Sequence, residues 1–408
     1  MFLRLQERHG FKGEHIVAFA LLFNTFSWYF IGLLMIDKVG YFFSEVSFEN
    51  LYLRLVYTVS IIASALVGSV SLAKVRKVRF FYVWLLFGII ASLFLATPMV
   101  SSLFTTLVMV MLLGSSMGLG MPLCLSYFTE STPIENRGKL SGIILFATIF
   151  SAPFVSIIMS TLDLVSSAVI LALWRGWSLP MLFFTPKKSD DFEPRIQRTP
   201  SLISVFQNRT FVLYFVAWLM FTLVDSFGSV FVNFHVGEIR FLIGIVEPSV
   251  AGVSALIGGV LSDQVGRKRV MIFGFVSLGV AYAMVGLAAH IWIAWLFYFI
   301  IDGIALGLLV VLFVMVLWGD LPRNGSEKFY AVGVAPFFLT QMLSLLLAPY
   351  VALIPETSAF SLAAFFLFIA VIPLLYARET LPEKKIQQRQ LKIYTEEALK
   401  LKQKIKQK

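Results

Sequence analysis

The sequence predicts an all-α integral membrane protein with twelve transmembrane helices in two bundles of six. Three features predict it: an apolar composition, a series of long apolar runs, and the placement of basic residues between those runs. Apolar residues make up 59% of the 408 residues and charged residues only 14%, whereas soluble domains average about 45–50% and about 25%. A soluble globule of this size has no place for so much apolar surface, but a bilayer is itself an apolar solvent.

Twelve apolar runs are long enough to cross a membrane, which takes roughly 20 mostly apolar residues per helix. The runs cover residues 15–36, 51–73, 80–97, 101–128, 140–160, 162–184, 211–234, 241–262, 270–289, 291–317, 329–351 and 357–377. The strands of a membrane barrel would alternate apolar and polar residues over about ten positions, whereas these runs are continuously apolar. Because only helices and closed barrels satisfy the backbone in lipid, the runs predict helices.

The basic residues divide the segments between these runs into two sets. If the N-terminus is cytoplasmic, all but four of the 33 Lys and Arg fall on cytoplasmic segments, as the positive-inside rule requires. The four exceptions are Lys38, Arg54, Arg175 and Arg240. We therefore expect both termini in the cytoplasm and, because the outer loops are short, a multi-pass protein of the plasma membrane. The net charge of +10 lies in loops and the tail, so we expect a lipid bilayer and not nucleic acid as its partner.

The longest internal polar stretch divides the chain into two halves. Residues 185–210 form this central cytoplasmic loop, between six runs in 15–184 and six runs in 211–377. A short segment, 1–14, precedes the first run, and a basic tail, 378–408, follows the last one. For the tail we favour a solvated charged helix over an amphipathic helix that lies on anionic lipid.

The loop between the eighth and ninth runs reads Gly-Val-Leu-Ser-Asp-Gln-Val-Gly-Arg-Lys-Arg. Gly259 allows two helices to approach closely. Asp263 is suited to accept hydrogen bonds from the exposed amides at the N-terminus of a neighbouring helix, and Gly266 allows a positive φ in the turn. We expect the basic residues to hold the loop at the cytoplasmic headgroups; they are Arg267, Lys268 and Arg269.

This loop resembles the G-x-L-x-D-R-x-G-R-R/K pattern of the major facilitator superfamily, with Gln264 where the family usually has Arg or Lys. The resemblance covers the whole chain as six plus six helices. It implies two pseudo-symmetric bundles and a loop that latches the two halves on the cytoplasmic side. The equivalent first-half segment, 68–77, keeps basic residues but lacks the Asp and the second Gly, so the two copies of the loop are not equivalent.

A second loop, after the fourth run, also resembles the family. Glu130, Pro133, Arg137 and Gly138 match its E-x-x-P-x-x-x-R-G pattern, and a looser counterpart after the tenth run begins at Asp320. These matches are typical of the superfamily but select no branch, so they leave the solute open.

Ionisable residues inside apolar runs are costly in lipid and are therefore candidates for function. Asp225 lies in the seventh run and Asp302 in the tenth. The resemblance implies that these two helices line a central cavity, together with the first and fourth. A buried carboxyl that loses and regains a proton as the cavity opens to each side would couple transport to a proton gradient. The alternatives are direct binding of a cationic group and a structural hydrogen bond to a neighbouring helix.

Four more residues are candidates on weaker grounds. Asn24 offers a polar contact from the first run, and Glu247, followed by Pro248, indicates either a broken eighth helix at the site or the true start of that helix. Arg54 suits an outer gate or the binding of a substrate anion, and equally a contact with headgroups. Arg175 stands among tryptophans of the sixth run, and because tryptophan marks membrane interfaces, we expect its side chain to reach the headgroups.

The resemblance implies a secondary active transporter that moves a small solute by alternating access, and the acidic residues favour proton coupling. Symport and antiport, and uptake and efflux, all stay open. An ATP-driven pump would need a P-loop, which the sequence lacks, and an enzyme would need clustered His, Asp or Glu at one membrane face. We therefore expect no enzyme, no cofactor, no metal site and a monomer. The alternative function is a facilitator-like sensor or partner-binding protein that no longer transports.

Overall fold

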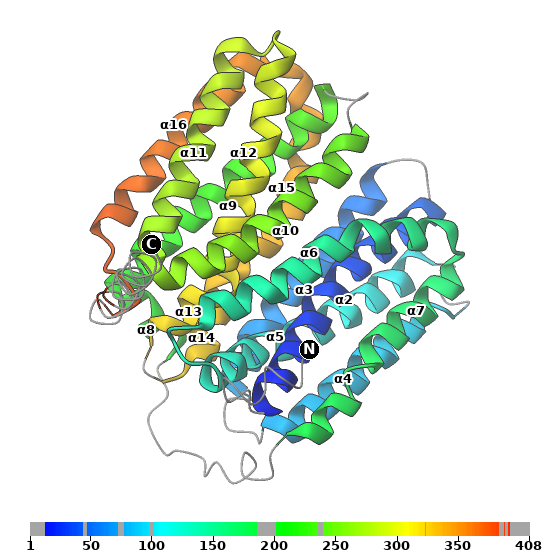
Figure 1. The fold of residues 1–408 in the computed structure, drawn as a ribbon. Coiled ribbons are helices and arrows are strands. Elements are labelled where there is room, and N and C mark those ends of the chain that lie inside the picture. The colour runs from blue at the N-terminus through cyan, green and yellow to red at the C-terminus, as the bar shows by residue number, and fades with distance from the viewer. Residues whose placement is uncertain are drawn as a thin grey trace, which may run out of the picture.

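The computed structural model describes residues 13–43, 47–71, 77–97, 102–185, 201–235, 240–322, 324–382, 387 and 391 (Figure 1). All regular elements in this part of the chain are helical. Eleven of the described helices are long and apolar enough to cross a membrane, and a shorter apolar helix, Val78–Phe94, lies where the third run was predicted. The prediction of twelve apolar helices is therefore confirmed, and the chain is a multi-pass membrane protein.

The first six helices pack on one another as one bundle. They are α2 (Gly13–Phe43), α3 (Ser47–Ser71), α4 (Lys77–Phe94), α5 (Leu103–Ser131), α6 (Arg137–Thr161) and α7 (Leu164–Gly176), which is followed by a 3-10 turn, Pro180–Phe184. Helix α3 lies along α5, α4 lies against α5 and α7, and α2 contacts α5, α6 and α7. Gly118 permits the close α3–α5 approach, because a Cβ there would collide with the carbonyl oxygen of Ile61.

The remaining helices form the second bundle. After the short α8 (Leu202–Gln207) come α9 (Arg209–His235), α10 (Arg240–Val265), α11 (Arg267–Ala288), α12 (Trp292–Val310), α13 (Leu317–Asp320), α14 (Ser326–Gly333), α15 (Ala335–Leu347) and α16 (Glu356–Tyr376). A π-helical segment, Val311–Val316, joins α12 to α13, and a 3-10 segment, Ala348–Leu353, follows α15. Helix α10 packs on α12, α11 on α12 and α16, and α9 on α15 and α16.

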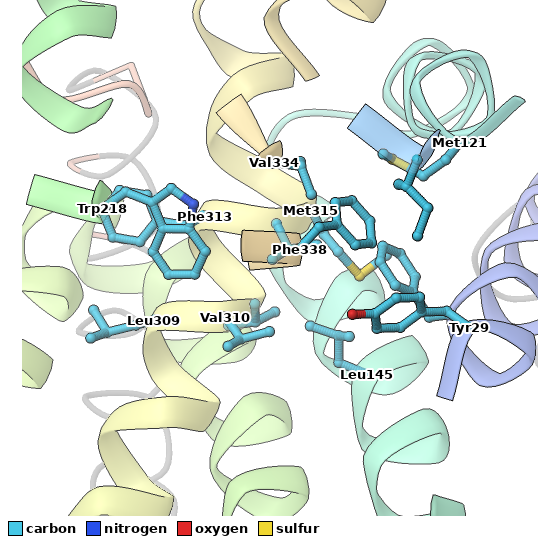
Figure 2. Close-up of a cluster of buried hydrophobic side chains, with 14 of the residues drawn as sticks. Tyr29, Met121, Leu145, Trp218, Leu309, Val310, Phe313, Met315, Val334 and Phe338 are labelled. Atoms are coloured by element: carbon cyan, nitrogen blue, oxygen red, sulfur yellow. The ribbon is translucent and has the colours of Figure 1, made fainter. Parts of the chain in front are cut away.

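The two bundles meet along α6 and α10, which run side by side between them (Figure 1). Apolar side chains of other helices also form a cluster between the bundles, with members from α2, α5 and α6 of the first bundle and from α12 and α15 of the second (Figure 2). Tyr29 of α2 packs edge-on against Phe338 of α15, with 5.1 Å between the ring centroids. Leu145 of α6 lies on the same side of the cluster as Tyr29, facing Val310 of α12 (Figure 2).

The structure contradicts both interpretations of Glu247 and Pro248. Helix α10 runs without interruption from Arg240 to Val265 with Pro248 inside it, so neither a broken helix nor a helix start at Glu247 is correct. Transmembrane helices tolerate such a proline because neighbouring groups satisfy the freed backbone. The predictions for the segments 1–12, 72–76 and 186–200 and for most of the tail beyond Pro382 lie outside the described residues.

Candidate functional site

Asp263, near the end of α10, holds the N-terminus of α6 in the other bundle. Its Oδ1 accepts a hydrogen bond from the backbone N–H of Gly138 (3.0 Å), and its Oδ2 accepts one from that of Lys139 (2.8 Å). These are first-turn amides, which have no partner within their own helix and carry the positive end of the helix dipole. The predicted role of Asp263 is confirmed, and the amides lie in the first turn of α6, which begins where the second loop pattern ends at Arg137 and Gly138.

Glycines allow this contact between the bundles. A Cβ on Gly259 would collide with the carbonyl oxygen of Gly138, and a Cβ on Gly138 would lie 2.5 Å from the carbonyl oxygen of Gly259 and 2.7 Å from Oδ1 of Asp263. Gly266 precedes α11 with a φ of 104°, a conformation that residues with a side chain rarely adopt. The roles predicted for Gly259 and Gly266 are therefore confirmed.

Arg267 corrects one prediction, because its side chain is buried between the bundles and does not reach the headgroups. Its Nη1 donates to Oδ1 of Asp263 (2.6 Å), and its Nη2 donates to the carbonyl oxygen of Ile134 in the first bundle (2.8 Å). Lys268 is partly buried, and its Nζ donates to two carbonyl oxygens at the end of α16. Only Arg269 of the three basic residues is exposed.

Asp320, at the end of α13, receives an arginine from each bundle. Nε of Arg267 donates to its Oδ2 (3.1 Å), and Nη1 of Arg137 donates to its Oδ1. The carboxylate is fully buried, and the side chain of Arg137 is 7% exposed. Arg137 also donates to the carbonyl oxygen of Thr129 at the end of α5 (2.8 Å). We call Arg137, Gly138, Asp263, Arg267 and Asp320 the latch.

Glu379 fulfils at α11 the role that Asp263 has at α6. Its carboxylate accepts hydrogen bonds from the backbone N–H groups of Arg267 (3.0 Å) and Lys268 (3.1 Å). Sequence reasoning did not identify this cap. The other two residues of the second loop pattern, Glu130 and Pro133, lie exposed beside the latch, where Ser126 donates to Glu130 (3.1 Å).

Three acidic side chains come together inside the second bundle, from three helices. Asp302 of α12 lies within electrostatic range of both Glu247 of α10 and Asp225 of α9. Asp302 is 5% exposed, and the other two are partly buried. The ion pairs between described residues involve none of the three. We call these residues the acidic trio; the structure brings together three of the four residues predicted for coupling or solute binding.

Two tyrosines of the same bundle lie beside the trio. The hydroxyl of Tyr298 donates to that of Tyr282 (3.4 Å), and both are within electrostatic range of Asp302 and Glu247. Among the described residues no group of three or more His, Cys, Asp or Glu side chains is arranged to hold a metal ion. The acidic trio and the two tyrosines thus place carboxyl groups, which can exchange protons, near hydroxyl groups, which can form hydrogen bonds.

A cavity of ≈ 280 Å³ lies between the bundles. Its walls come from α2, α3 and α6 of the first bundle and from Pro248, which follows Glu247, in the second. Asp37 and Arg54 form an ion pair in the wall, with 2.9 Å between Nε and Oδ1. These residues lie in the parts of their helices remote from the latch, so the cavity and the latch occupy opposite ends of the interface.

Asn24, the fourth predicted residue, lies apart from the trio and inside the first bundle. Its Nδ2 donates to the carbonyl oxygen of Trp174 (2.5 Å), and its Oδ1 accepts from Nη1 of Arg175 (3.1 Å). Arg175 corrects a second prediction, because its side chain is fully buried in the bundle and does not reach the headgroups.

Comparisons with known proteins agree with this architecture. Residues 210–406 match the family model described as Major Facilitator Superfamily, and a search of curated proteins found no match. The solved proton:xylose symporter XylE superposes with a TM-score of 0.69 at 14% identity, over 90% of this chain and 96% of that one. The fucose:proton symporter FucP of E. coli gives 0.67 at 10% identity, over 89% and 98%. The human organic anion transporter MFSD10 (TETRAN) gives 0.64 at 14% identity, over 89% and 99%.

Two independent likenesses therefore agree. The superfamily's model matches the C-terminal half, which contains the trio and most of the latch, and the solved transporters match almost the whole chain in fold. The chain therefore has the twelve-helix fold of the major facilitator superfamily's solved transporters, and its C-terminal half matches that superfamily's model.

Proposed function

We propose that the protein is a secondary transporter that moves a small solute across the plasma membrane by alternating access and couples this movement to protons through the acidic trio. The observation that carries the proposal is the burial of Asp302 beside Glu247 and Asp225, with no basic side chain paired to any of them among the described residues. We further propose that both termini are cytoplasmic and that the protein works as a monomer.

The physical argument concerns the charge state of three neighbouring carboxyl groups. Like charges at short range repel strongly where the dielectric constant is low. Ionising all three carboxyl groups at once therefore costs a large free energy. Access to water lowers this cost. The number of protons that the trio holds therefore depends on which side of the membrane it faces, and this dependence is what coupling requires.

The latch and the cavity support alternating access. The latch ties the bundles together at one end of the interface through Asp263 and Asp320, while the cavity lies toward the other end. Opening the latch end requires the bonds from Arg137 to Asp320 and from Gly138 to Asp263 to break. Rocking of two bundles about a central site is the motion by which such repeats expose that site to each side in turn.

The comparisons support the same proposal. Two of the similar structures are described as proton symporters and a third as an organic anion transporter. Identities of 10–14% carry the fold to this chain but not a solute, so the coupling must be tested directly.

The test uses purified protein in liposomes that contain a pH-sensitive dye. Pools of sugars, organic acids and organic cations are added outside, and proton flux is followed for the wild type and for Asp302→Asn and Asp225→Asn. Asp163→Asn is the matched control, since Asp163 is an exposed acid that caps α7 and Asn caps helices equally well.

We expect solute-dependent proton flux in the wild type and the control, and its loss in Asp302→Asn, while exchange of labelled solute between the two sides persists. Exchange persists because it needs the rocking motion but no net release of protons. Unchanged proton flux in both trio variants would show that the trio does not couple. If no solute moves through folded wild-type protein, the non-transporting alternative is correct.

A further inference from the structure

Arg175 is a buried cation without a counter-ion in the described part of the chain. Its side chain is fully buried in the first bundle, and its guanidinium lies over the rings of Trp28 (4.7 Å to the centroid) and Trp84 (4.1 Å). The ionisable groups within electrostatic range of it are Cys124 and Tyr57, a thiol and a phenol that are neutral at physiological pH. An ionised side chain inside a membrane is costly and is therefore a candidate for function.

The guanidinium of Arg175 donates hydrogen bonds through only one of its three nitrogens among the described residues. Nη1 donates to Oδ1 of Asn24, whereas Nε and Nη2 have no hydrogen-bond partner among the described residues. Nε and Nη2 carry the two parallel N–H groups of the side-on edge of a guanidinium. This edge matches the two oxygens of a carboxylate in a bidentate pair. Asn24 and the two tryptophan rings thus hold the guanidinium in place. The edge that fits a carboxylate has no hydrogen-bond partner among the described residues.

Two neighbouring residues keep this edge available. Gly88 of α4 packs close to this edge: a Cβ there would lie only 2.8 Å from Nε of Arg175, so a larger residue at position 88 would crowd Nε. The hydroxyl of Tyr57 is also buried without a hydrogen-bond partner among the described residues. A carboxylate held by Arg175 would give this hydroxyl, as well as the edge, an acceptor.

The cavity between the bundles lies close to this place. Arg54, which lines the cavity, is three residues before Tyr57 on α3, so the two side chains emerge on the same face of the helix. Ser27 also lines the cavity and accepts a hydrogen bond from Nε1 of Trp174 (2.8 Å), the residue before Arg175. The cavity therefore reaches residues that lie within one turn of Tyr57 on α3 and of Asn24 on α2, the neighbours of Arg175.

We propose that the side-on edge of Arg175 binds the carboxylate of a transported monocarboxylic acid. This inference rests on the proposed transport function and names its solute class. One fixed positive charge among neutral groups is balanced by one negative charge, so a monovalent carboxylate fits and a phosphate dianion would leave a buried excess charge. A carboxylate bound in the first bundle and protons carried by the trio in the second together constitute symport of an acid with protons.

Binding is tested on the full-length protein in detergent at constant ionic strength. Sodium acetate, lactate and benzoate are compared with their neutral amides and with sodium nitrate, by the shift of the thermal unfolding midpoint and by tryptophan fluorescence, to which Trp28 and Trp84 contribute. Arg175→Gln removes the cation. Gly88→Ala keeps the cation and fills the space beside Nε. Arg269→Gln, an exposed arginine, is the control.

We expect at least one carboxylate to bind the wild type and the control, while its neutral amide does not. The affinity should fall roughly 10- to 100-fold in Arg175→Gln, since charge-assisted hydrogen bonds are lost, and fall also in Gly88→Ala. If Arg175→Gln does not fold, Gly88→Ala decides. Equal binding of acid and amide, binding of nitrate alone, or carboxylate binding unchanged in Gly88→Ala and Arg175→Gln would overturn the inference.

The same variants separate this inference from the proposed transport function. Asp302→Asn should bind the carboxylate as the wild type does and lose proton flux in liposomes. If no carboxylate binds but another solute drives proton flux, the inference is wrong and the proposed function stands. If carboxylates bind through Arg175 but drive no flux, the site is correct and the coupling is wrong.

Discussion

Replacing Asp320 by Asn should open the latch. The carboxylate of Asp320 joins Arg137 of the first bundle to Arg267 of the second and has no exposed surface. The bond to Arg267 lies within the second bundle and survives opening, but the bond to Arg137 does not. Asn keeps the shape of the side chain and removes its charge, so the variant loses an attraction that exists only in the closed arrangement.

The magnitude follows from the burial of the pair. Hydrogen bonds to charged groups contribute about 1.5–3 kcal/mol, and breaking one partner of a buried ion pair costs about 3–5 kcal/mol. Because Arg137 retains the carbonyl oxygen of Thr129 and Arg267 retains Asp263, we expect about 2–4 kcal/mol. This corresponds to a shift of roughly 30- to 700-fold from the closed to the open latch.

Distances between the bundles measure this shift directly. Spin labels at Lys139→Cys on α6 and Arg269→Cys on α11, both exposed positions, report the separation at the latch end. The single native cysteine, Cys124, is replaced by Ser. We expect the Asp320→Asn distance distribution to gain a longer component. The matched control is Asp37→Asn, which breaks the Asp37–Arg54 pair inside the first bundle. An unchanged distribution in Asp320→Asn, or the same change in the control, would refute the reasoning.

Two further predictions concern single positions. Gly138→Ala should lower the thermal unfolding midpoint and the rate of solute exchange, because its Cβ would lie 2.5 Å from the Gly259 carbonyl oxygen. Gly176→Ala should be neutral, because the nearest atom to its Cβ would be 3.5 Å away. Equal effects of the two substitutions would show that the close approach at Gly138 is unimportant. The Ser166 hydroxyl and the backbone amides lower the pKa of Asp163, so its carboxylate stabilises the protein above its ordinary pKa and this contribution is lost as pH falls through the lowered value. The unfolding midpoints of the wild type and Asp163→Ala should therefore differ near neutral pH and converge in acid, and a constant difference would contradict this sign.

The sequence predicted those parts of the site whose roles depend on residues close to them in the chain. Asp263 and the glycines around it have roles that follow from one tight turn and one close helix contact, so their spacing was sufficient. Asp320 was noted only as a loose counterpart of another loop. Its arginine partners lie 53 and 183 positions away, and nothing local distinguishes a buried acid at a helix end from an exposed one.

Arg175 shows a different limit of sequence reasoning. Tryptophans beside it in the sequence indicated a membrane interface, but its real neighbours are Trp28 of α2 and Trp84 of α4, together with Asn24. Composition near a residue reports its depth in the membrane only when the side chain faces lipid. For a residue that faces its own bundle, the decisive neighbours come from other helices, and only the fold brings them together.

The unequal loops of the two halves lead to an unequal closure at the latch end. On one side of the interface, a carboxylate on α10 caps α6 with two charge-assisted hydrogen bonds. On the other side, the start of α14 meets α5 through hydroxyls: Ser326 donates to Ser126 (2.9 Å), and Thr129 bonds to Tyr330 (2.8 Å). Hydrogen bonds to an ionised group are roughly twice as strong as neutral ones. The Asp that the first-half loop lacks is thus matched by weaker contacts at α14, and the charged contacts around Asp263 and Asp320 contribute most of the polar stabilisation of the closed end.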